Sequence, residues 1–348
     1  MSPGRSRSRL GSPDHRLWLG HSARHRRLRE DLWHHRHGRR GGPGIGTVAE
    51  RRQRSQRSWV MLIPRTRYTD IIADLDALRE AARELRIGCP SDRLGALSRR
   101  ISTLQDLQGN ADGLVKFSQQ HGDPALAWNL VEALEFSSVW KAFGPDLSRI
   151  LELLAKALEG SADPAAEGTK GDKARARNVM FELRLAAFLT LRGVAVEFRE
   201  PDLRITLAGW ELLIACKRPA SRERVVRNVR NALSQIRKAR ASSRALGMVA
   251  ISVSRLLENT LPPLPGTPFA EELSDRLADH VERELEPEIQ EARKLMRDTP
   301  EGDLLLLHMS KPVWVDDEAI LTWTEQSVVR SSPGLDPAFL VELQRVLA

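Results

Sequence analysis

Three charged side chains between residues 182 and 217 are of the types that bind a divalent cation and act on a phosphodiester. Glu182 lies within an apolar helical pattern, Asp202 follows a proline, and Lys217 ends an apolar run. A buried carboxylate is costly unless it is paired or bound to metal, and a lysine at the end of a central strand needs a nearby anion. Two carboxylates and a lysine at one sheet edge could hold Mg²⁺ and polarise a phosphodiester. A purely structural ion pair between Asp202 and Lys217 is the competing interpretation.

The elements that must position these residues alternate between helix and strand. Gly193 predicts the end of an apolar helix, and Ala208 with Gly209 predicts a tight turn between two strands. Hydrophobic periodicity gives the remaining bounds. The expected elements are a helix over 174–191, strands over 194–198, 203–207 and 211–216, a basic amphipathic helix over 222–240, and a strand over 248–253. This alternation is typical of an α/β chain.

The rest of the chain suggests two further regions. Residues 61–160 are expected to form an all-α helical domain, with helices near 69–85, 91–107, 125–140 and 146–158. A small, polar linker over 161–172 precedes a second domain over 173–348. That domain is expected to contain a helical insertion at about 256–300 with a break at Pro287, strands over 304–309 and 319–323, and a closing helix over 337–346.

The sequence pI of about 10 has a local source. Residues 1–60 hold 15 arginines, no lysine and four acids, a net charge of +11, whereas the whole chain carries +8, so residues 61–348 carry −3. A stretch so poor in apolar periodicity is predicted to be a disordered N-terminal tail. Three interpretations of it stay open: an arm that binds nucleic acid, a targeting peptide, or a segment upstream of a true start at Met61.

The cysteines and the hydropathy of the chain indicate in which cellular compartment the protein is expected. Cys89 and Cys216 lie far apart in unrelated contexts, which argues against a disulfide framework and for a reducing, cytoplasmic setting. No apolar run reaches the length of a membrane span, so no membrane partner is expected.

The order helix-strand-strand-strand-helix-strand, with charged residues on the second and third strands, resembles the PD-(D/E)xK (restriction-endonuclease-like) nuclease superfamily. The resemblance covers roughly residues 173–253. Members carry an acid in the first helix, an Asp after a Pro, an acid-x-Lys motif on the next strand and often a Gln in the following helix. In this chain those places are taken by Glu182, Asp202, Lys217 and Gln235.

The resemblance implies a restriction-endonuclease-like αβββαβ core, here preceded by the all-α helical domain and the disordered N-terminal tail. It implies a catalytic set of Lys217, Asp202, Glu182 and Gln235. It also implies that Asp202, Glu182 and the backbone carbonyl of Cys216 hold Mg²⁺ or Mn²⁺. The implied activity is metal-dependent hydrolysis of a phosphodiester in nucleic acid, DNA before RNA. The expected contacts to nucleic acid come from Arg218, Arg222, Arg224 and Asn228. Whether the protein forms a homodimer is left open.

One motif position departs from the family pattern. Residues two apart on a strand share a face, so the acid that should accompany Lys217 is replaced by Ala215. Glu223, at the start of the next helix, and Glu200 are the candidate replacement acids. The alternative to an active nuclease is a catalytically inactive nuclease-fold module that serves binding or assembly.

Overall fold

The structure is a computed structural model, and it describes residues 59–60, 67–89, 92–107, 123–161, 172–240, 245–257, 281–299, 302–315, 320–332 and 334–347. All of them belong to one compact unit, Ser55–Ala348. Residues 1–58 of the predicted tail lie outside the described residues, as do 162–171 of the predicted linker and 258–280 of the predicted insertion.

The described strands form one mixed sheet of seven strands in the order β1-β7-β6-β5-β4-β3-β2. Their bounds are β1 Trp59–Val60, β2 Val196–Arg199, β3 Asp202–Leu207, β4 Trp210–Lys217, β5 Ala245–Ser252, β6 Leu304–Val315 and β7 Ile320–Ser331. Strands β2, β3 and β4 form an antiparallel meander, β5 and β6 run parallel to β4, and β7 is antiparallel to both β6 and β1. The carboxyl ends of β4 and β5 therefore lie at one end of the sheet with the first residue of β3, while β6 continues beyond them to Val315.

Helices account for most of the described residues outside the strands. They are α3 Tyr68–Glu84, α4 Arg93–Asp106, α6 Asp123–Phe143, α7 Leu151–Leu158, α8 Asp172–Leu191, α9 Val225–Ala239, α11 Glu286–Arg297 and α12 Pro337–Leu347, with short 3₁₀ turns at Gly144–Ile150, Arg222–Arg224 and Ser254–Leu257. Over residues 172–252 the element order is helix, three strands, helix and strand, as expected from the sequence. The chain is thus mixed α/β.

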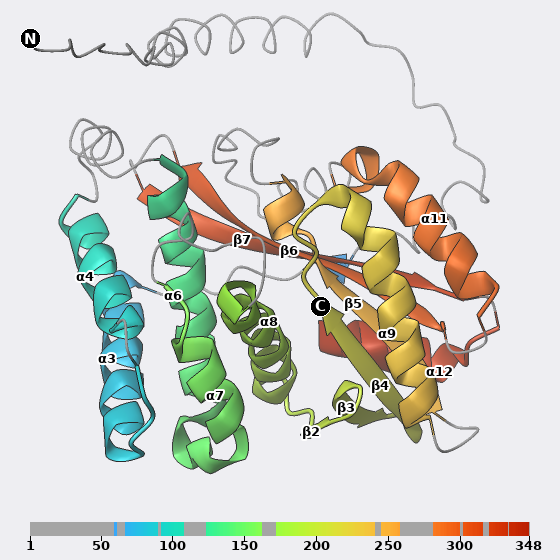
Figure 1. Cartoon of the computed structure of the whole chain (residues 1–348), viewed down its shortest axis with the longest axis horizontal. Coiled ribbons are helices and arrows are strands. Elements are labelled where there is room, and N and C mark those ends of the chain that lie inside the picture. Colours follow the sequence, from blue (N-terminus) through green and yellow to red (C-terminus); the bar gives the residue numbers. More distant parts are fainter. Residues whose placement is uncertain are drawn as a thin grey trace, which may run out of the picture. The chain divides into compact units, whose positions relative to one another are not determined.

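Successive side chains of β4 point to opposite faces of the sheet, and the hydrophobic core is accordingly divided into two clusters. Leu212 and Ile214 pack with α8 and the N-terminal helices, whereas Leu213 and Ala215 pack with α9 and α11 on the other face. Figure 1 shows this layering, with α9 and α11 on one side of the sheet and α8, α7 and α6 on the other. The stripe of Val225, Val229 and Ile236, all buried, fixes which face α9 turns to the sheet.

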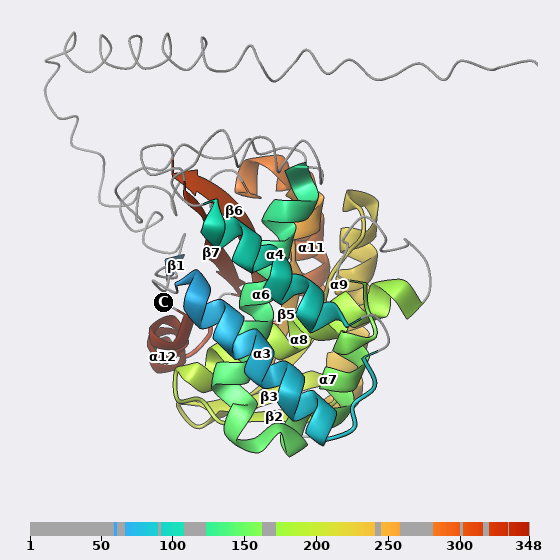
Figure 2. The same ribbon diagram turned by 90° about the vertical axis from the view of Figure 1, so that its left-hand side faces the viewer.

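Helices α3, α4, α6 and α7 lie side by side in front of the sheet in Figure 2. Their buried apolar residues belong to the same cluster as those of α8 and the sheet, so one continuous hydrophobic core joins the N-terminal helices to α8. Helix α8 lies between these helices and the strands, in contact with α6, α7, β2, β3 and β4.

Several elements differ from the expectation. Trp59 and Val60 form β1 against β7, although they fall within the predicted tail. The chain from 144 to 150 is a 3₁₀ turn rather than the start of an α-helix. Strands β6 and β7 are longer than expected, because Lys311 and Pro312 interrupt the apolar pattern in the sequence while the hairpin continues. The predicted break at Pro287, in contrast, agrees with the structure: residues 281–284 are helical, Leu285 lies in a turn, and α11 begins at Glu286 with Pro287 in its first turn.

Candidate functional site

Asp202 and Lys217 are brought together by the hairpin of β3 and β4. The turn residues Ala208 and Gly209 both adopt a positive φ, of 48° and 78°, which matches the tight turn that joins twisted antiparallel strands. Asp202 is the first residue of β3 and Lys217 the last of β4, so the antiparallel pairing places them at one end of the hairpin. The carboxyl end of β5 lies beside Lys217, which pairs with Ile251.

The Asp202 carboxylate is held by two donors. Its Oδ2 accepts hydrogen bonds from the Cys216 backbone N–H at 2.7 Å and from Lys217 Nζ at 3.2 Å. Lys217 Nζ also donates to the Cys216 carbonyl oxygen at 2.8 Å. Burial raises the pKa of Asp202 above its ordinary value, while the Lys217 charge and the Cys216 N–H act against that rise. The pair is therefore a mostly buried, hydrogen-bonded ion pair.

Ala215 lies beside Asp202 across the hairpin. Leu203 pairs with Ile214, and continuing that register by one residue sets Asp202 opposite Ala215. Residues directly opposite on antiparallel strands have Cβ atoms roughly 5 Å apart. A carboxylate at position 215 would therefore reach the same small volume as the Asp202 carboxylate. Ala215 itself is fully buried in the apolar cluster under α9.

Glu182 joins this pair from α8. Burial and the negative charge of Asp202 raise the pKa of its carboxyl to about 7, against the opposing effect of the lysines Lys217 and Lys156. These electrostatic effects place Glu182 in the same neighbourhood as Asp202 and Lys217. Glu182 is thus within electrostatic range of the Asp202–Lys217 pair.

The donors present fit a divalent cation site with few protein ligands. Two carboxylates of raised pKa, Glu182 and Asp202, are hard oxygen donors whose negative charge a cation would stabilise. The Cys216 carbonyl is adjacent, although it accepts from Lys217. Within the part of the chain that the structure describes, no group of three or more His, Cys, Asp or Glu side chains gathers in a way that could hold a metal. A cation here would depend on two carboxylates, one carbonyl and water.

The two candidate replacement acids differ in their relation to the site. Glu200 is exposed, and its charge is among those that raise the pKa of Asp202. Glu223 is fully exposed in the turn before α9, where a hydrogen bond from Ser221 lowers the pKa of its carboxyl. Glu223 is not among the charges that shift the pKa of Asp202 or Glu182. Of the two, Glu200 is the acid that interacts with the site.

Gln235 is not brought to Asp202 and Lys217 by any contact in the described residues. It is half-buried on α9, and its buried Oε1 has no hydrogen-bond partner there. Helix α9 starts after the turn that follows Lys217 and runs back alongside β4 (Figure 1). Gln235 lies ten residues after Val225, the first residue of this helix. At 1.5 Å per residue that is roughly 15 Å along the helix axis.

The residues expected to contact nucleic acid have mixed environments. The Arg222 guanidinium pairs with the Glu284 carboxylate at 3.0 Å and donates to the Glu284 carbonyl at 2.8 Å. Arg224 is exposed, Arg218 is half-buried, and Asn228 donates to the Arg224 carbonyl at 2.9 Å. Arg222 is therefore already engaged with the protein, whereas the Arg224 side chain faces solvent.

Lys156 is a residue of this neighbourhood that sequence reasoning misses. It lies in the last turn of α7 and is half-buried, and its charge lowers the pKa of Glu182. It precedes Glu182 by 26 residues, in a helix with no motif of its own. Only the packing of α7 against α8 brings the two together, so no local sequence signal could have found it.

Comparison of the chain with protein-family models, curated proteins and solved structures found no match. Among the described residues, every helix is too short or too polar to cross a membrane.

Proposed function

We propose that this protein is a Mg²⁺-dependent or Mn²⁺-dependent nuclease of the PD-(D/E)xK type that hydrolyses phosphodiester bonds in nucleic acid, DNA before RNA. One observation carries the proposal: Glu182, Asp202 and Lys217, three ionisable side chains, gather at one sheet edge in the order and on the elements of that superfamily's motif. Clusters of buried groups with raised pKa values are more frequent at functional sites than elsewhere.

In this proposal Asp202 and Glu182 hold the cation, with the Cys216 carbonyl as a further oxygen donor. When bound, Mg²⁺ supplies positive charge that polarises the phosphodiester. Lys217 orients the attacking water and stabilises the negative charge that develops on the phosphate oxygens. Its side chain is positioned for this by β4, whose last residue it is, and by the Asp202 carboxylate.

Substrate would approach over the turn and helix that follow Lys217. Arg224 is exposed at the start of α9, and Arg227 and Arg230 extend the exposed positive charge along the helix. Cations arranged along a helix suit a sugar-phosphate backbone and carry no base specificity. Arg218 and Asn228 belong to the same approach, while Arg222 contributes less because Glu284 neutralises it.

The test is cleavage of plasmid and single-stranded DNA by the full chain with Mg²⁺ or Mn²⁺, beside Lys217→Ala and Lys294→Ala. Lys294 is an exposed lysine on α11, which makes it a matched control for the loss of one positive charge. We expect metal-dependent cleavage that falls by at least about 100-fold in Lys217→Ala and is unchanged in Lys294→Ala. Equal activity of all three proteins would attribute the cleavage to a contaminant.

A specific observation favours a second candidate, an inactive nuclease-fold module. Ala215 is fully buried, and in its place an acid would have faced Asp202. Two lysines, Lys156 and Lys217, already act on the carboxylate of Glu182 without any metal. If folded full-length protein cleaves no DNA with either metal but retains it in a binding assay, this second candidate is supported.

A further inference from the structure

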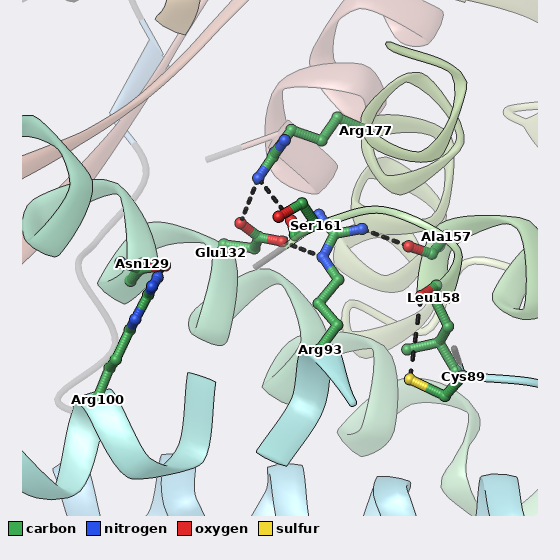
Figure 3. Close-up of polar contacts among 9 residues, drawn as sticks. All are labelled: Cys89, Arg93, Arg100, Asn129, Glu132, Ala157, Leu158, Ser161 and Arg177. Carbon is green, nitrogen blue, oxygen red and sulfur yellow. Dashed lines mark hydrogen bonds and ion pairs between the residues drawn. The ribbon is translucent and has the colours of Figure 1, made fainter. Parts of the chain in front are cut away.

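A buried network of two arginines and one glutamate joins four helices next to the site. Glu132 of α6 accepts from Arg93 of α4 on Oε1 and from Arg177 of α8 on Oε2, the latter at 3.1 Å. Figure 3 shows the Glu132 carboxylate between the two guanidinium groups. Each arginine also donates to the backbone where α7 ends: Arg93 to the Ala157 carbonyl, and Arg177 to the Ser161 carbonyl at 3.0 Å.

Because the network is buried, its side chains can shift little without losing their partners. Arg93 is 0% exposed, Glu132 5% and Arg177 7%. Charged groups removed from water must keep their partners, since a small displacement leaves a buried charge uncompensated. The turn after α7 adapts to the network as well, because a side chain at Gly160 would overlap the Arg93 guanidinium. The hydrogen bonds thus fix both the rotation and the axial position of α8 against α6 and α7.

The two helices that this network locks together are the ones that supply Glu182 and Lys156. Arg177 precedes Glu182 by five residues on α8, roughly 7.5 Å along the axis. Lys156 immediately precedes Ala157, whose carbonyl Arg93 binds. A turn of α8 about its axis, or a slide past α7, would change the place of Glu182 relative to Asp202 and Lys217.

We propose that Arg93, Glu132 and Arg177 are positioning residues for the candidate site: they hold α7 and α8 in one register, so that the N-terminal helices form part of the scaffold that places Glu182. This inference rests on the proposed role of Glu182 as a metal ligand. An apolar contact could hold the helices together equally strongly, but it would leave rotation and sliding less restricted than directional hydrogen bonds do.

The test compares Arg177→Met with Leu104→Ala in the full chain. Arg177→Met removes the α8 arm of the network and leaves the Arg93–Glu132 pair balanced in charge. Leu104→Ala opens a cavity where α4 packs into the hydrophobic core and destabilises the fold, while all three residues of the network stay in place. Both are measured at a temperature where each variant is folded. We expect Mn²⁺ affinity, measured by titration calorimetry, to fall on the order of tenfold in Arg177→Met and to stay unchanged in Leu104→Ala. Equal affinity in Arg177→Met and the unsubstituted protein would overturn the inference.

A second readout separates this inference from the proposed function. Spin labels at two exposed positions, Glu152 of α7 and Asn178 of α8, report the helix register by electron-electron distance measurement, with Cys89 replaced by serine. We expect a broader or shifted distance distribution in Arg177→Met, with recovery in Arg177→Lys, and no change in Leu104→Ala. An unchanged distribution in Arg177→Met overturns the positioning role whether or not metal binds. Failure of the unsubstituted protein to bind Mn²⁺ overturns the metal site instead, while the distances still decide the register.

Discussion

Lys217 forms hydrogen bonds with the same oxygen atoms that would bind a cation in the proposed site. Its Nζ binds both the Asp202 carboxylate and the Cys216 carbonyl, so without metal the lysine itself stabilises the negative charge at this sheet edge. In the proposed nuclease the ammonium group must share these oxygens with the metal. Position 215 then becomes decisive, because a third carboxylate would restore the excess of negative charge that favours a divalent cation.

Ala215→Asp should therefore create a stronger metal site at a cost in stability. Without metal, a buried carboxylate opposite Asp202 lowers the free energy of unfolding by about 2–4 kcal/mol, since its charge is desolvated and repelled. Added Mn²⁺ should recover most of that loss. Thermal unfolding in EDTA and in Mn²⁺ measures both effects.

The matched control is Ala292→Asp, a buried alanine of α11 in the same apolar cluster. It should lose a similar amount of stability and regain none with Mn²⁺. Recovery of both variants, or of neither, would contradict the placement of position 215 beside Asp202.

Glu182 gives the site a pH dependence with a definite sign. Its pKa is about 7 in the folded chain, against 4.5 ordinarily, so between these values the folded state holds a proton that the unfolded state has lost. Stability must fall as pH rises through this window, by up to about 3 kcal/mol in the absence of metal. Chemical denaturation in EDTA at pH 5 and pH 8 measures the fall.

Glu182→Gln removes this contribution, so its unfolding free energy should change less between pH 5 and pH 8 than that of the unsubstituted chain. Other groups titrate equally in both proteins, and the difference between the two curves isolates Glu182. Parallel curves would mean that Glu182 is not buried beside Asp202.

At the scale of elements, the turn after α7 is tightly packed at Gly160. Gly160 lies against the Arg93 guanidinium and the Ala176 side chain, which leave no room for a side chain at position 160. Gly160→Ala should lower the free energy of unfolding by about 1–3 kcal/mol through overpacking. Gly88→Ala is the control: Gly88 has open space around it, so the change should be neutral or stabilise the fold by up to about 1 kcal/mol. Urea denaturation compares them, and equal effects would contradict the packing of Arg93 at this turn.

Elements with a strong local signal could be predicted from the sequence. The Ala208-Gly209 turn fixes the β3–β4 hairpin, and the hairpin register alone sets Asp202 beside Lys217 and Ala215. The buried stripe of α9 follows from its periodicity in the same way. Each of these depends on residues close in sequence, where turn chemistry and hydrophobic period act directly.

Elements that depend on distant contacts could not be predicted. The Arg93–Glu132–Arg177 network joins residues 39 and 45 positions apart, and nothing near any one of them in sequence marks a partner. The pairing of β1 with β7 depends on a contact between residues nearly 270 positions apart. Such contacts are specified by packing across the whole core, which no sequence window contains.

Over the whole molecule, positive charge and the candidate site are separated along the chain. Residues 1–54 hold 14 arginines and four acids, a net charge of +10, while the whole chain carries +8, so Ser55–Ala348 carries −2. A folded unit of slight negative charge repels a polyanion at long range. In the proposed nuclease, contact with nucleic acid must then come from local groups such as Arg224, Arg227 and Arg230, which are exposed along α9.

Removing residues 1–54 should therefore change how DNA binds without changing the fold. The unfolding temperature should stay within about 2 °C, because the removed residues belong to a separate unit. The slope of log affinity against log salt for duplex DNA, measured by fluorescence anisotropy in EDTA, should become shallower by several units, since each phosphate contact contributes about −0.9.

The DNA affinity that remains after truncation should fall further when Arg227→Ala and Arg230→Ala are combined. It should not fall in Arg293→Ala, the control at an exposed arginine on α11. An unchanged slope after truncation would place the DNA contacts on the folded unit alone, and insensitivity to the α9 substitutions would remove that helix from the interface.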